Sequence, residues 1–196
     1  NYNKVNIKNN TIALLNVESK SFYGMEPQNA ISLNIEHNFI NVASSNNTET
    51  FYGINTSLCK NYNVINGNKI WMSDTILQGR AISLSNFGTE ATKMSVVSNN
   101  ELSLIFTPQR ANNDFAGIYI MNSNVAIVNN SIRISGGSQY ETQGIYQTGN
   151  LSETGYLVIK NNNIDISIFL FCHYCKSRHF FLFFALFGLH IRYQAL

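Results

Sequence analysis

The sequence predicts an all-β solenoid of about six stacked coils, with three short strands per coil and a ladder of asparagine side chains at one corner. The first observation is an asparagine that recurs in one sequence frame, at Asn10, Asn38, Asn68, Asn100, Asn130 and Asn162. Successive members of this set are 28, 30, 32, 30 and 32 residues apart. A fixed period in this range indicates repeats that bury their apolar faces by stacking on one another.

Two strands are predicted to flank each of these asparagines. With the asparagine as position zero, positions −3, +2 and +4 are apolar in all six repeats. Position −5 is apolar in four repeats and polar in two, at Asn63 and Ser95. Apolar residues two apart, separated by polar ones, are typical of strands with one buried face. The break in this alternation at the asparagine predicts a tight corner between the two strands.

Asparagine suits such a corner for two reasons. It tolerates left-handed backbone conformations, and its side chain can bond to nearby backbone groups. Stacked corners would also let each amide bond to the next, so we expect a ladder. His37, which precedes Asn38, is interpreted as an asparagine substitute in the corner column.

The third strand of each coil is predicted from a motif that places a small residue before an apolar one. The small residues lie 13 to 17 positions after the corner asparagine, at Gly24, Gly53, Ala81, Gly117 and Gly144. Polar segments of variable length lie between the second and third strands, which predicts loops on one side of the solenoid.

This pattern resembles the right-handed parallel β-helix of the pectin-lyase-like superfamily, over about Val5 to Ile166. A leucine-rich repeat is the alternative, because Val5-x-Ile7-x-x-Asn10-x-Ile12 fits its consensus. Against it, the apolar residues are mainly Ile and Val, position +4 is always apolar, and the other half of the repeat contains strand formers.

Composition excludes some classes of partner. Charged residues are 12% of the chain, the net charge is +2, and the lysines and arginines are scattered, so no nucleic-acid site is predicted. The chain begins with Asn1 and enters the repeat at once, so we expect a fragment of a secreted or surface-exposed protein.

The repeats are predicted to occupy residues 1–167, and residues 168–196 form a different segment. This tail holds seven of the 13 phenylalanines and no asparagine. It is interpreted as an end cap, a membrane-associated segment or a reading-frame artefact; its apolar runs are too short for the roughly 20 residues of a bilayer span. Cys172, Cys175 and His179 have ligand types for zinc but lack a second pair at the usual spacing, so no metal site is predicted.

The resemblance implies that a ligand would lie on the outer face of the third strands. Asn55, Ser83, Tyr119 and Tyr146 are expected to point outward there, and Asn55, Tyr119 and Tyr146 are the candidate ligand-binding residues. Tyr119 and Tyr146 occupy equivalent positions, so their rings could contact sugars or could only stabilise the sheet.

Asp114, Glu141 and Arg80 are the catalytic candidates. Asp114 and Glu141 each precede a glycine by three residues, so stacking would bring them together at the edge of the same face. Such a pair could serve as general acid and nucleophile, or could bind calcium, and Arg80 could contact an acidic sugar. The Asp clusters used by pectate lyases and polygalacturonases have no match here.

The function predicted from these residues is binding of a glycan or another surface without demonstrable catalysis and without a cofactor. Two alternatives stay open: a polysaccharide lyase or glycoside hydrolase using the Asp114 and Glu141 face, and a repeat scaffold with no ligand.

Overall fold

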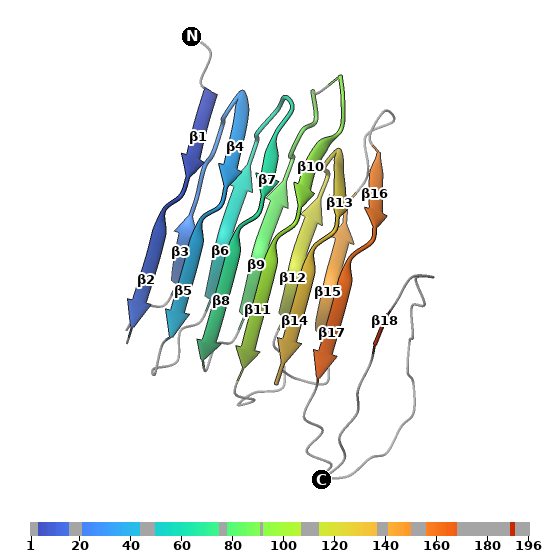
Figure 1. Cartoon of the computed structure of the whole chain (residues 1–196). Helices are drawn as coiled ribbons and strands as arrows, with labels where there is room; N and C mark the ends of the chain where they lie inside the picture. Colours follow the sequence, from blue (N-terminus) through green and yellow to red (C-terminus); the bar gives the residue numbers. More distant parts are fainter. Residues whose placement is uncertain are drawn as a thin grey trace.

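The computed structural model describes residues 4–15, 21–43, 50–74, 78–90, 92–106, 114–136, 141–149, 156–167 and 189–190. These residues form three parallel sheets stacked as a β-solenoid (Figure 1), and they contain no helix. The all-β prediction is therefore confirmed. The leucine-rich alternative is wrong, since strands form the half of the repeat in which that fold would place a helical segment.

Each coil contributes one strand to each sheet. The first sheet contains β1 (Lys4–Lys8), β4 (Ser32–Glu36), β7 (Val64–Asn66), β10 (Ser95–Ser98), β13 (Val125–Val128) and β16 (Leu157–Lys160). The second sheet contains β2 (Thr11–Leu15), β5 (Phe39–Ala43), β8 (Lys69–Asp74), β11 (Glu101–Phe106), β14 (Ser131–Ser135), β17 (Asn163–Ser167) and β18 (Leu189–His190). The third sheet contains β3 (Ser21–Met25), β6 (Thr50–Ser57), β9 (Gln78–Ser85), β12 (Asp114–Met121) and β15 (Glu141–Thr148).

The solenoid is right-handed. In Figure 1 the chain descends the near side through the first two sheets and climbs the far side through the third, as the coils advance from left to right. The predicted number of coils, about six, is wrong: about four turns are complete. The reason is that the six asparagines count rungs at one corner, whereas four complete turns separate β3 from β15, the first and last of the five strands in the third sheet.

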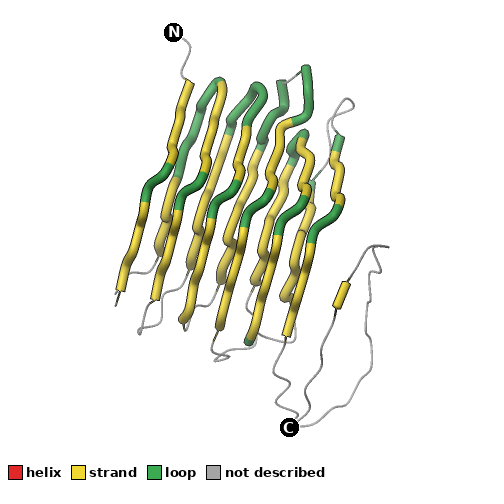
Figure 2. The backbone as a smooth tube through the Cα atoms, viewed as in Figure 1, coloured by secondary structure: helices red, strands yellow, loops and turns green. Residues whose placement is uncertain are grey.

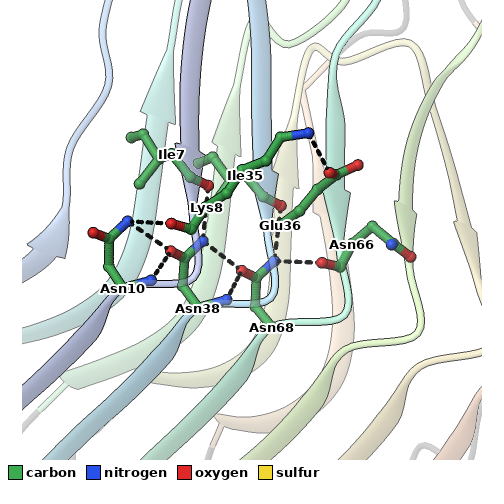
Figure 3. Close-up of polar contacts among 8 residues, drawn as sticks. All are labelled: Ile7, Lys8, Asn10, Ile35, Glu36, Asn38, Asn66 and Asn68. Carbon is green, nitrogen blue, oxygen red and sulfur yellow. Dashed lines mark hydrogen bonds and ion pairs between the residues drawn. The ribbon is translucent and has the colours of Figure 1, made fainter.

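The predicted asparagine ladder is present at the corner between the first two sheets, where Figure 2 shows a short loop in each coil. The Nδ2 of each ladder asparagine donates to the Oδ1 of the next at 2.9–3.0 Å, as Figure 3 shows for the first three members. The same Oδ1 also accepts the preceding asparagine's backbone N–H at 2.9–3.0 Å. Each Nδ2 after the first also donates to a backbone carbonyl one coil back, at 2.8–3.1 Å. The buried amides therefore have partners for both donor and acceptor atoms.

The left-handed conformation at this corner belongs to the residue before the ladder asparagine. These residues have φ between 55° and 65°, and they are Asn9, His37, Gly67, Asn99, Asn129 and Asn161. The ladder asparagine therefore supplies hydrogen bonds, and its neighbour supplies the turn. His37 occupies its predicted place in this column.

A second corner follows the third strand and was not predicted. Its left-handed residues have φ between 48° and 77°, and they are Asn29, Leu58, Asn86, Asn122 and Gly149. The backbone N–H groups of Asn29, Leu58 and Asn86 each donate 3.0 Å hydrogen bonds to a carbonyl in the next coil. Because these bonds join backbone atoms, the corner repeats without repeating a side chain.

The two polar exceptions at position −5 lie near this second corner and are fully buried. The Oδ1 of Asn63 accepts the backbone N–H of Leu33 at 2.8 Å, and the Oγ of Ser95 accepts that of Asn63 at 3.1 Å. Both side chains are therefore core residues with hydrogen-bond partners in the adjacent coil.

Candidate functional site

The third sheet has an inner face that approaches the second sheet closely. A Cβ added to Gly53 would lie 2.7 Å from the Cγ2 of Ile70, and one added to Gly117 would lie 2.4 Å from the Cγ2 of Ile132. At both positions the added Cβ would also lie 2.6 Å from a backbone carbonyl oxygen on the next strand of the third sheet, that of Ala81 or Gly144. The small residues of the motif therefore serve packing, and the candidate site must lie on the other face.

The outer face carries two columns of side chains in register across the strands. One contains Tyr23, Tyr52, Arg80, Ala116 and Gln143, and the other contains Asn55, Ser83, Tyr119 and Tyr146. The predicted second column is therefore correct in register. Parallel pairing, with about 4.8 Å between neighbouring strands, brings these residues together although they are far apart in sequence.

An aromatic strip crosses this face from β3 to β15, and it consists of Tyr23, Tyr52, Arg80, Tyr119 and Tyr146. The rings of Tyr23 and Tyr52 are stacked, with centroids 5.1 Å apart and planes 7° apart. The Cζ of Arg80 lies 5.7 Å from the centroid of Tyr52 and 3.5 Å from that of Tyr119. The Tyr119 and Tyr146 centroids are 5.6 Å apart, with ring planes tilted by 57°. Each of the five strands contributes one member.

The rings in this strip cover one another in part. Tyr23 and Tyr52 stack across neighbouring strands, so each covers part of one face of the other. One face of Tyr119 is covered by the guanidinium group in a cation–π contact. Within the described part of the chain, the four phenol hydroxyls have no hydrogen-bond partner, and none is a buried oxygen. They are therefore donors and acceptors open to solvent.

The sequence prediction found part of this strip. Tyr119, Tyr146 and Arg80 were proposed, but Tyr23 and Tyr52 were missed, although the repeated Phe-Tyr-Gly motif marks both. Of the other predicted residues, Asn55 donates to Glu26 Oε1 at 3.0 Å and lies outside the strip. Ser83, although in the outward column, is only 4% exposed.

The two candidate carboxylates are brought together at the level of the backbone. Asp114 pairs with Glu141 at the start of β12 and β15. Their side chains lie outside what the structure describes. Among the side chains that it does describe, no group of three or more His, Cys, Asp or Glu could hold a metal ion.

Predictions for residues 168–196 fall outside the described residues, apart from the backbone of β18. Leu189 and His190 pair with Ile164 and Asp165 of β17. Within the described ranges, no helix is long and apolar enough to cross a bilayer.

Comparison with known proteins finds no family model, curated protein or solved structure that matches this chain significantly. The structure supports one part of the resemblance to the pectin-lyase-like superfamily, the architecture of a parallel β-solenoid.

Proposed function

We propose that this protein is a non-catalytic module that binds linear polysaccharides on the outer face of its third sheet. The aromatic strip is the observation that carries the proposal. Its phenol hydroxyls can donate to and accept from sugar hydroxyls, and its rings offer apolar contact. The location that fits this function is outside the cell or at its surface, and fractionation of the native source would test that.

Affinity electrophoresis through gels containing xylan, mannan, mixed-linkage glucan or polygalacturonate tests this proposal. The wild-type protein is expected to be retarded by at least one polymer. The double variant Tyr119→Ala/Tyr146→Ala should lose most of that retardation, because it removes two strip members, one of which is the ring in contact with Arg80.

Trp71→Ala is the matched control, because Trp71 is an aromatic residue on the second sheet with 39% of its surface exposed. This variant should migrate like the wild type. No retardation in any gel, or equal retardation of both variants, would remove the proposed function.

An enzyme is the second candidate, and the backbone register of Asp114 and Glu141 favours it. In this proposal the chain is a pectin-lyase-like polysaccharide lyase or glycoside hydrolase, in which the two carboxylates act on a sugar chain beside Arg80. Reducing-end release and unsaturated-product absorbance on polygalacturonate and xylan would be measured for Asp114→Asn and Glu141→Gln. Absence of turnover, or turnover unaffected by either change, excludes an enzyme at this position.

A scaffold without a ligand is the third candidate, because stacking within the strip also stabilises the third sheet. It predicts that ring-removing substitutions lower stability while no polysaccharide retards the protein.

A further inference from the structure

We infer that the aromatic strip is a single extended site, and that it selects unbranched sugar chains long enough to run along the solenoid axis over all five strands of the third sheet. This inference rests on the proposed function and adds Tyr23 and Tyr52 to it. Its starting point is that successive strip members lie on five consecutive strands of one parallel sheet.

The length of the site follows from the strand spacing. Four intervals of about 4.8 Å separate β3 from β15, so the strip is about 19 Å long. A disaccharide cannot contact both Tyr23 and Tyr146. A longer chain lying parallel to the axis can contact every member in turn.

The strength of each contact is limited by the ring contacts within the strip. Stacking covers the face of Tyr52 that points to Tyr23, and Arg80 covers one face of Tyr119. Each strand that carries a tyrosine of the strip therefore offers a partly covered ring and one hydroxyl. A single hydrogen bond of this kind changes affinity only by roughly two- to tenfold, so useful affinity requires several coils to act together.

Tyrosine-to-phenylalanine variants separate this role from sheet stabilisation. Tyr23→Phe and Tyr52→Phe keep the stacked rings and remove only the hydroxyls, so their thermal midpoints should match the wild type. Tyr62→Phe is the matched control, because Tyr62 is outside the strip and its ring also contacts a cation, with Lys93 Nζ 4.1 Å from the centroid.

Isothermal titration calorimetry with xylo-, cello- and galacturonate oligosaccharides, from disaccharide to decasaccharide, provides the test. In the series that binds, affinity should rise with each added sugar and level off once the chain covers the strip. Tyr23→Phe and Tyr52→Phe should each weaken decasaccharide binding roughly two- to tenfold, while Tyr62→Phe leaves it unchanged.

Two results would overturn the inference alone: a disaccharide that binds as tightly as the decasaccharide, or wild-type decasaccharide affinity in Tyr23→Phe and Tyr52→Phe. In both cases the proposed function survives if Tyr119→Ala/Tyr146→Ala abolishes binding. If no series and no polysaccharide binds, both proposals fall.

Discussion

Ala81 and Leu102 are the exceptions in two columns that otherwise contain Gly and Ile, and both are buried in the same core cluster. In the other coils, the small residue of the third sheet meets an Ile at position +2 of the next coil, as Gly53 meets Ile70 and Gly117 meets Ile132. The strand registers place Ala81 on β9 and Leu102 on β11 at the equivalent positions, and these two strands pack together, so we infer that this pair meets in the same way. Leu has no Cγ2 methyl on its Cβ, so the space that an Ile would fill is available to the alanine methyl.

This relationship predicts strong coupling between the two positions. Leu102→Ile should cost about 1–3 kcal/mol, because its Cγ2 would overlap the alanine methyl. Ala81→Gly alone should cost about 1 kcal/mol through backbone entropy. The double variant should be more stable than Leu102→Ile, since it recreates the Gly and Ile pair of the other coils. Urea unfolding midpoints measure this cycle, and additive losses would contradict the packing argument.

The interior of the asparagine ladder should be far more sensitive to substitution than its end. Asn100→Ala would leave the buried backbone N–H of Asn68 without its acceptor. It would also remove the bonds that the Asn100 side chain makes with Asn68 Nδ2, the Ile65 carbonyl and Asn130 Oδ1. We expect a loss of about 3–5 kcal/mol in unfolding free energy. The control is Asn10→Ala at the exposed first rung, with an expected loss below about 1 kcal/mol. Similar losses of unfolding free energy for the two variants in chemical denaturation would contradict the expectation that burial makes the interior rungs more important.

Cys59 should be inert in the folded protein. Its side chain is fully buried, and this burial raises the pKa of the thiol above its ordinary value of 9.0. At neutral pH the reactive thiolate is therefore scarce as well as shielded. In a Cys172→Ser/Cys175→Ser background, an aromatic disulfide reagent should react slowly with the native protein and rapidly in urea. Equal rates in the two conditions would contradict the burial.

Glu36 should contribute a small, pH-dependent stabilisation. A hydrogen bond from Lys8, whose Nζ lies 2.6 Å from Oε2, lowers the pKa of Glu36 below its ordinary value of 4.5. Because the folded pKa is lowered, the stabilisation is present above the unfolded pKa and is lost as pH falls through the folded pKa. The pair is partly exposed, so the effect should be below about 1 kcal/mol. Glu36→Gln should reduce the stability difference between neutral pH and pH below 4.5, and an unchanged difference would count against this pair.

The fold is most visible in the sequence where one residue type repeats for one physical reason. Asn38 and Asn68 each use both the donor and the acceptor atoms of the amide in the ladder. Asparagine therefore recurs at that corner, and the recurrence is visible in the sequence. The second corner left no such signal, because residues as different as Asn29 and Leu58 adopt the same left-handed turn and make the same backbone bond to the next coil. The candidate site was found in part: Tyr119 and Tyr146 share a visible frame, whereas Tyr23 and Tyr52 lie in a different column of the same strip.

By itself, the sequence determined the strand pairs, the ladder corner and the inward positions, because alternation of apolar residues is local and recurs in every repeat. Only the tertiary structure decided which outward residues meet across the third sheet. Loops of different lengths separate the second and third strands, so sequence distance does not give the register there; the parallel pairing between coils does. That pairing brings Arg80 from one column between Tyr52 of the same column and Tyr119 of the other, a contact that no spacing in the chain indicates.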